Sequence, residues 1–232
     1  MKTKILLGVI VAVILTGLAV FLYQTRPVAA PTTDVNSQVT HLDDQAQNTS
    51  DVSASSRTLR IDSTASHVEF SLGEDLNGET ITVNGITDQL AGDVQLNTDG
   101  TFSMTIGEIK IDARTFKTDN ERRNAAIARM ILKTEEAGNE YIVFTPNKIE
   151  GLPEKVVTNE AFSYQVTGNL TIAGSTRAVT FAATSTLKED GSLQGFADTT
   201  IAYGDWGITV PDLPFLANVE KTAKLQIVFV AR

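Results

Sequence analysis

The sequence predicts an all-β protein: a lipocalin-like antiparallel barrel of about eight strands with one helix, preceded by an N-terminal transmembrane or signal helix. Apolar and polar residues alternate with a period of two through most of residues 57–232, which is typical of strands with one buried face. Only residues 118–138 show the spacing of a helix, and only residues 5–23 form a long uncharged apolar run. Two separate sheets would each need more chain, so a single sheet curled into a barrel fits this length.

The N-terminal run has the charge pattern of a membrane segment. Lys2 and Lys4 precede residues 5–23, and a transmembrane helix needs roughly 20 apolar residues whereas a cleavable signal core has about 7–15. We therefore expect residues 1–26 to be an uncleaved anchor. If the segment is cleaved, we expect the protein to be secreted. The positive-inside rule places the two lysines in the cytoplasm and the domain in the periplasm or on the outer cell surface.

Residues 27–56 have the composition of a flexible linker. They are rich in Thr, Ser, Asp, Gln, Asn and Ala and show no hydrophobic period. The folded domain is therefore expected over residues 57–232.

The strands follow from the two-residue period and from the turn residues between the runs. Asn97-Thr98-Asp99-Gly100 predicts a hairpin turn, and a change of apolar parity at Gly107 predicts a bulge or sharp bend. The first two runs form either a strand pair or one long bent strand. The expected strands lie at 59–61 and 68–72, then at 80–87, 90–96, 101–112, 140–149, 155–158, 161–173, 176–187, 192–204 and 219–231.

The single helix is expected over residues 118–138, with about four turns. Its apolar residues recur at i, i+3 and i+4, which gives the helix one buried face. Thr118 and Glu121 form a capping-box pattern at its start, and Gly138 is a natural stop.

The residue inventory excludes several classes of function. The formal net charge of −9 disfavours nucleic acid and anionic headgroups as main partners, because both bind Lys/Arg patches. The chain has no cysteine, so disulfides, thiolate catalysis and Cys-ligated metals are excluded. His67 is the only histidine of the domain, and its neighbour Ser66 points to the opposite face of a strand. We therefore expect no catalytic residue, no metal site and no cofactor.

The apolar faces of the strands predict either plain core or a barrel with an internal slot. The segments at 161–173 and 175–187 are longer than the usual strand of about 5–6 residues, and a barrel of about eight long strands holds one ligand. Residues 205–221, which include Phe215, form either a rim or lid over the slot or a packed loop that closes the barrel end. The candidate ligand-binding residues are Phe102, Met104, Ile106, Phe144, Phe162, Tyr164, Phe181, Phe196, Ile201, Trp206, Phe215 and Phe229.

Several stretches of the domain resemble the YceI-like, polyisoprenoid-binding family. The most distinctive is VTGNLTIAGSTRAVTF at 166–181, with the pattern Gly-x-Leu-Thr-Ile-x-Gly-x-Thr-x-x-Val. RIDSTASHVEFSL resembles the opening segment of the family, FKTDNERRNAAIARMIL with YIVFTPNKIEGLP its central block, and YGDWGI with KLQIVFVAR its end. The resemblance implies a lipocalin-like barrel around a long isoprenoid or similar lipid tail, export from the cytoplasm and no catalysis.

Two positions depart from the family pattern. Leu59-Arg60 stands where the family has an aromatic residue before Ile-Asp, and Arg122-Arg123-Asn124-Ala125 replaces the usual helix motif. For this reason no polar residue at the barrel mouth is assigned a role.

The favoured hypothesis is an extracytoplasmic domain that binds, sequesters or transports an apolar lipid of the polyisoprenoid or quinone-like class. Burial of each lipid methylene is worth about 0.8 kcal/mol, so a neutral tail binds without an ion pair. The alternative is a non-catalytic structural or interaction module of the cell envelope, active in stress or adhesion, with a filled barrel. An enzyme acting on a lipid is the least supported hypothesis, and a homodimer is left open.

Overall fold

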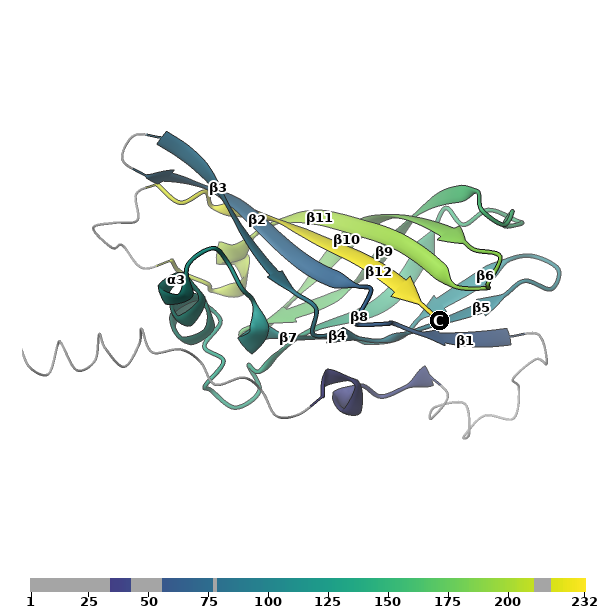
Figure 1. The fold of residues 1–232 in the computed structure, drawn as a ribbon, viewed down its shortest axis with the longest axis horizontal. Helices are drawn as coiled ribbons and strands as arrows, with labels where there is room; N and C mark the ends of the chain where they lie inside the picture. Colours follow the sequence, from purple (N-terminus) through teal and green to yellow (C-terminus); the bar gives the residue numbers. More distant parts are fainter. Residues whose placement is uncertain (1–33, 43–55, 77–78, 211–217) are drawn as a thin grey trace, which may run out of the picture.

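The computed structural model describes residues 34–42, 56–76, 79–210 and 218–232, and these form an antiparallel β structure with one α-helix (Figure 1). The predicted all-β class is confirmed. The strands are β1 (Ser56–Arg60), β2 (His67–Leu76), β3 (Glu79–Thr87), β4 (Leu90–Ala91), β5 (Asp93–Asn97), β6 (Ser103–Ile106), β7 (Ile109–Asp112), β8 (Tyr141–Glu150), β9 (Ala161–Ile172), β10 (Ser175–Leu187), β11 (Leu193–Ala202) and β12 (Thr222–Ala231). The helices are η1 (Val35–Gln38), η2 (Ala113–Thr115), α3 (Glu121–Ala126), the π-helix η3 (Ile127–Ile131) and η4 (Tyr203–Trp206).

Two hydrogen-bonded sheets build the barrel. The larger has the strand order β3-β2-β12-β11-β10-β9-β8-β7-β4, and the smaller has the order β1-β5-β6. Gly92 separates β4 from β5, so one stretch of chain pairs first with β7 and then with β1 and β6. Two isolated bridges, Ile61 with Ala231 and Ile86 with Lys117, nearly complete the circuit. The strands outnumber the roughly eight expected, because breaks at glycine divide the expected strands into shorter ones.

The strand boundaries follow the turn chemistry of the sequence in most places. The expected hairpin joins β5 to β6, where the Asp99 N–H donates to Asn97 Oδ1 and Gly100 has a φ of 74°. The expected break at Gly107 separates β6 from β7. The predicted strand over residues 155–158 is wrong, because these residues lie in the connection between β8 and β9, which pair directly with each other. The first two runs are separate strands, and β1 pairs with β5 whereas β2 pairs with β12 and β3.

The helix expected over 118–138 is shorter and begins later. Asn120 is its N-cap, and its side chain accepts two backbone N–H hydrogen bonds from the first turn of α3. The expected cap Thr118 instead donates its hydroxyl to an asparagine side chain of the helix. α3 then widens into η3, where the Leu132 N–H donates to the Ile127 carbonyl oxygen five residues earlier. The four-turn prediction is therefore corrected to a short α-helix that continues as one π turn.

The predicted anchor or signal segment, residues 1–26, lies outside the described residues. None of the helices that the structure does describe is long and apolar enough to cross a membrane. The division into 1–26, 27–56 and 57–232 stays a prediction.

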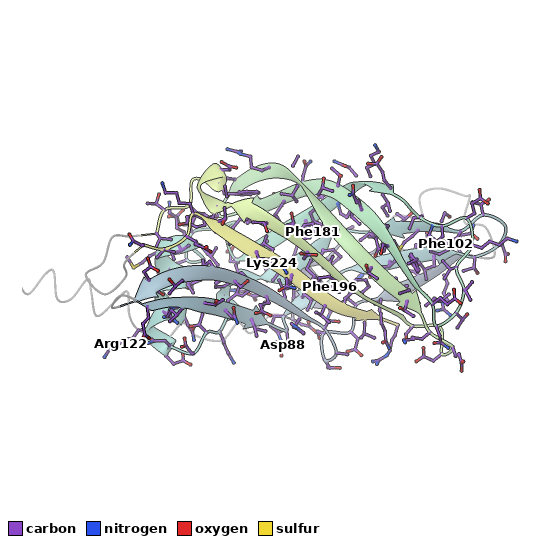
Figure 2. All side chains as sticks on the ribbon, turned by 90° about the horizontal axis from the view of Figure 1, so that it is seen from above. Asp88, Phe102, Arg122, Phe181, Phe196 and Lys224 are labelled. Carbon is purple, nitrogen blue, oxygen red and sulfur yellow. The ribbon has the colours of Figure 1, made fainter. Side chains whose placement is uncertain are left out.

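The pairing of β9 with β10 shows how alternation builds the wall of the barrel. The two strands pair along their whole length, and Tyr164 and Phe181 lie on the buried face. On the outer face, Thr167 and Thr180 are hydrogen-bonded at 2.8 Å between their hydroxyl oxygens. Figure 2 shows side chains on both faces of the strands along the length of the barrel. The sheet therefore has one apolar face turned inward and one polar face turned to solvent.

A short segment ahead of β1 packs on the outside of the barrel (purple in Figure 1). Residues 34–42, called the strap below, contain η1 and bury Val35 and Val39 against Ala91 of β4. The Lys110 ammonium donates to a carbonyl oxygen of the strap at 2.6 Å. Part of the stretch whose composition predicts a linker therefore lies against the domain.

A buried carboxylate holds the end of the strap. Asp93 of β5 is 1% exposed, and its carboxylate oxygen lies 2.8 Å from His41 Nδ1. The same carboxylate accepts the Leu42 N–H at 3.0 Å. A carboxylate this deeply buried needs hydrogen-bond partners to offset its lost hydration. The strap supplies those partners.

Removal of the strap imidazole should destabilise the domain. His41→Ala leaves the Asp93 carboxylate with fewer partners, so the free energy of unfolding should fall by about 1–3 kcal/mol. Equilibrium urea unfolding of the full chain measures this change. Gln38→Ala alters an exposed side chain of the same strap and should shift the free energy by less than about 0.5 kcal/mol. Equal stability of His41→Ala and the wild type would contradict this role of the strap.

Candidate functional site

The candidate site is the barrel interior, where the buried apolar residues form one continuous cluster. Aromatic rings make up much of it. The rings of Phe144 and Phe181 meet edge to face with centroids 5.1 Å apart, and those of Phe102 and Phe162 do so at 5.5 Å. Tyr164 stacks on Phe162 at 5.7 Å. The interior is therefore a surface for apolar and aromatic contact.

One side-chain hydrogen bond lies inside this apolar cluster. The Tyr164 hydroxyl and Ser185 Oγ are 2.9 Å apart, and Ser185 is 1% exposed. Burial raises the pKa of the Tyr164 phenol above its ordinary value of 10.0, and the hydrogen bond to Ser185 opposes part of that shift. The phenol is therefore neutral at physiological pH and adds no charge to the interior.

Two glycines make room for aromatic rings on the inner face. Gly85 is paired with Phe70 across β3 and β2, and a Cβ atom at Gly85 would overlap the Phe70 ring. Gly195 is paired with Phe229 across β11 and β12, and a Cβ atom there would lie 2.5 Å from the ring. Each ring therefore lies over the backbone of the neighbouring strand and projects less far across the interior.

Part of the interior is lined by apolar residues that are only half-buried. They lie on three adjacent strands and are cross-strand neighbours. On the same face of β12, Ala223 and Phe229 at either end are 7% and 9% exposed. The half-buried residues between them therefore keep part of their surface uncovered by other protein atoms. We call these residues the inner wall: Phe70 and Leu72 of β2, Ala197 of β11, and Leu225 and Ile227 of β12.

Charge is found at one end of the interior, near α3. Glu74 of β2 is 2% exposed, and its Oε2 lies 3.6 Å from Nη2 of Arg123. Arg123 also forms an ion pair with Asp119, which is exposed to solvent. The guanidinium therefore offsets the buried carboxylate, and the inner wall itself carries no charged residue.

Most of the residues predicted from the sequence for the interior do face it. Trp206 has a structural role there, because its Nε1–H donates to the Leu170 carbonyl oxygen at 3.0 Å and ties η4 to β9. Phe215 lies outside the described residues, as does the centre of the expected lid over 205–221. Contact of any of them with a ligand stays a prediction. The core cluster contains Phe102, Met104, Phe144, Tyr164, Phe181, Ile201, Trp206 and Phe229, with Ile106 and Phe162 half-buried against it.

Phe196 is a correction, because it faces outward. It lies on β11 and is 37% exposed, while its neighbours Gly195 and Ala197 point inward. Figure 2 labels it on the ribbon near Lys224 of the adjacent strand. It borders a shallow depression of about 470 Å³ on the outer face, beside Gln165. The alternation along β11 places residue 196 outside, and its aromatic character alone suggested the interior.

Ser66 and His67 do not form a nucleophile–base pair. Ser66 is 4% exposed, and its Oγ accepts the Val230 N–H at 2.9 Å. His67 is the next residue along β2 and points to the other face. Within the described ranges, no three His, Cys, Asp or Glu side chains are grouped so that they could hold a metal ion.

The residues of the inner wall are not among the ligand-binding residues predicted from the sequence. The parity of KLQIVFV could have placed Leu225 and Ile227 on the same face as Phe229, and that of VEFSL could have paired Phe70 with Leu72. Their partial exposure has no sequence signal, because it depends on which strands lie across the barrel.

Comparison with known proteins identifies the domain type. The family model of the YceI-like domain matches residues 59–231. A polyisoprenoid binding domain from Saccharophagus degradans, implicated in plant cell wall breakdown, is similar with 16% identity, a TM-score of 0.58 and coverage of 75% of this chain and 97% of that chain. BcnA of Burkholderia cenocepacia is similar with 18% identity, a TM-score of 0.55 and coverage of 74% and 99%. At these identities the two structures show the fold alone. No match was found among the curated proteins.

A methyl group at Gly85 should disturb the inner wall. Gly85→Ala forces the Phe70 ring out of its place, so the free energy of unfolding should fall by about 1–3 kcal/mol in urea unfolding. Gly204→Ala is the control, because no atom lies within 4 Å of a Cβ built there. The double variant Gly85→Ala with Phe70→Leu should regain part of the loss. A Gly85→Ala protein as stable as the control would show that the ring does not depend on the glycine.

The stability of the domain at alkaline pH should depend on ionisation of the buried Tyr164 phenol. The pKa of Tyr164 is raised in the folded state, so its contribution to stability is full below the ordinary value of 10.0 and is lost as the pH rises through the folded pKa. Tyr164→Phe removes this loss. The stability of the variant relative to the wild type should therefore be constant up to about pH 9 and increase above about pH 10, measured by urea unfolding. Parallel pH profiles of the two proteins would contradict the assignment.

Proposed function

Because the chain belongs to the YceI-like domain family, we propose that its barrel binds an apolar lipid with a long hydrocarbon tail, of the polyisoprenoid or quinone-like class, and sequesters or carries it outside the cytoplasm. The observation that carries the proposal is the inner wall, whose apolar residues face the interior and yet remain half-buried. The similar domain from Saccharophagus degradans is a polyisoprenoid binding domain, which supports the class of ligand.

A plain core does not account for the inner wall. In a filled barrel Leu225 and Ile227 would be as buried as Ala223 and Phe229, which lie on the same face of the same strand. A hydrocarbon chain laid along the wall would cover them. Each methylene group removed from water contributes about 0.8 kcal/mol, so a tail of several isoprene units binds tightly through apolar contact.

The charge distribution favours a neutral tail inside and a polar group at an end. The inner wall has no charged residue, and the hydroxyl groups of Tyr164 and Ser185 already bond to each other. Glu74 and Arg123 lie at the end near α3. A buried polar headgroup along the wall would find no partner and would lose its hydration, so the headgroup belongs at a mouth of the barrel.

The proposed location rests on the N-terminal sequence. Lys2 and Lys4 precede an apolar run long enough to span a bilayer, which orients the domain away from the cytoplasm. A tethered barrel beside the membrane can exchange a lipid with the bilayer by a short path. The function needs no cofactor and no catalytic residue.

The experiment is lipid extraction from the full chain purified from the membranes of its own host. Native mass spectrometry should find about one apolar lipid per chain. Leu225→Gln places an amide on the inner wall and should weaken lipid binding at least about 5-fold, since an unpaired buried amide costs roughly 1–3 kcal/mol. Phe196→Gln, on the outer face, is the matched control and should keep the lipid.

Two results would contradict the proposal. One is a lipid-free wild-type chain that also fails to bind added polyprenol, which would favour the interaction module. The other is an equal loss of lipid from the Leu225 and Phe196 variants. Protease added to intact spheroplasts tests the location, because the domain should be degraded only if it lies outside the cytoplasmic membrane.

A further inference from the structure

The large sheet ends at β3 with an open edge. β3 pairs with β2 without a bulge, from Val68 with Thr87 to Leu76 with Glu79. On its other side, Ile86 exchanges two backbone hydrogen bonds of 2.9 Å with Lys117. In an antiparallel ladder, alternate residues direct their backbone groups to the same side. The N–H and C=O groups of residues 80, 82 and 84 therefore point to the same side as those of Ile86.

Among the described residues, these backbone groups have no backbone partner on that side. Beyond the Ile86–Lys117 bridge, the structure records no backbone hydrogen bond from Thr80, Thr82 or Asn84 to any part of the chain it describes apart from β2. The opposite end of the large sheet is different, because the strap packs on β4 and β4 continues into β5 of the smaller sheet. The described part of the chain therefore covers one end of the sheet and leaves residues 80–84 at the other end without a neighbouring strand.

The open edge also lacks the devices that usually prevent strand pairing. Monomeric proteins protect such edges with lysine, proline, inward-pointing charge or a bulge. Residues 80–84 read Thr-Ile-Thr-Val-Asn, with no charge and no proline. Their register with β2 is regular, and the side chains alternate between exposed Thr82 and buried Val83. A strand of this kind is complementary to another uncharged strand.

We propose that β3 pairs with β3 of a second copy of this chain, antiparallel about a twofold axis at Thr82. This register places Thr82 opposite Thr82, and Thr80 opposite Asn84 of the second copy. Each facing pair exchanges two backbone hydrogen bonds. The interface continues the larger sheet of one copy into that of the other.

The side chains favour a second copy as the occupant. Self-pairing in this register opposes residues 80–84, all uncharged, and places Glu79 opposite Gly85, so no like charges face each other across the ladder. On the inner face, Ile81 meets Val83 of the second copy, and both are apolar. On the outer face the facing residues are Thr and Asn, whose hydroxyl and amide groups pair across strands. The residues of this edge can therefore pair antiparallel with the same residues of a second copy.

Charge sets the conditions under which the dimer forms. Each chain has a net charge of −9, so two copies repel one another at long range. Salt screens this repulsion within a Debye length of about 8 Å at physiological ionic strength, whereas backbone hydrogen bonds and apolar contacts at the edge are little affected. Added salt should therefore strengthen the dimer. One strand pair also buries less than the roughly 1,200 Å² of a stable interface, so the association is weak and is best trapped covalently.

The chain has no cysteine, which makes a cysteine trap unambiguous. Thr82→Cys in the full chain, in detergent, places two thiols on facing residues about 5.5 Å apart between Cα atoms, within the range of a disulfide. Thr200→Cys is the control, since Thr200 is exposed on β11 in the middle of the large sheet. Under mild oxidation the Thr82 variant should form covalent dimer at least about 10-fold faster, with the rate rising with salt.

A second cross-linking experiment tests the register in which the two β3 strands pair. Neither Thr80→Cys nor Asn84→Cys should form a disulfide efficiently with itself, because residues 80 and 84 face each other and not their own copies. A mixture of the two variants should form the heterodimer. Thr82→Pro removes the N–H that points to the partner, so it should abolish cross-linking of the mixture when introduced into both chains.

Three results would overturn the proposal. The first is Thr82→Cys cross-linking no faster than Thr200→Cys, in a protein whose urea unfolding shows it folded. The second is heterodimer formation no faster than self-cross-linking by the Thr80 and Asn84 variants. The third is a monomeric Thr82→Cys chain protected from maleimide, which would show that the edge is occupied by something other than a second copy.

Discussion

Closure of the sheet underlies every other feature of this domain. Alternating strands always have one apolar face, and that face is protected from water only if the sheet curls until its ends meet. Here the change of partners at Gly92 and the bridges Ile61–Ala231 and Ile86–Lys117 bring the ends together, except along residues 80–84 of β3. A side chain at Gly92 would collide with Ile109, so the change of direction needs glycine at this point.

The interior that closure creates is lined by apolar residues that differ in how far they are buried. The Phe70 and Phe229 rings lie over Gly85 and Gly195 and so project less far across the interior, and Phe144 of β8 meets Phe181 of β10 edge to face. The inner wall is the result: apolar residues that are covered only in part. A surface of this kind has a thermodynamic reason to take up a hydrocarbon, because the hydration of its residues is already unfavourable.

The two ends of the large sheet differ in how far the described chain covers them. At β4 the strap covers the outer surface, and the buried Asp93 carboxylate makes that contact specific, since it needs the His41 ring and the Leu42 N–H. At β3 no described segment continues the ladder past Ile86. An exposed ladder without charge is a surface for another strand, so the same sheet that encloses the interior also provides an edge for association.

The local features of this protein could be predicted from its residues alone. The two-residue period identified the strands from β8 to β12, the glycines at 100 and 107 marked a turn and a break, and the segment at 166–181 indicated the family. These features depend on side-chain direction and backbone freedom, which are properties of neighbouring residues. The outward position of Phe196 also follows from local alternation, because its parity is opposite to that of Leu193 and Ile201. Three other features emerged only in the folded chain: residues 155–158 are not a strand, residues 34–42 pack on the barrel and Leu225 is half-buried. Each of these depends on what lies across the barrel or beside a strand, and contacts between residues distant in the chain leave no period in the sequence.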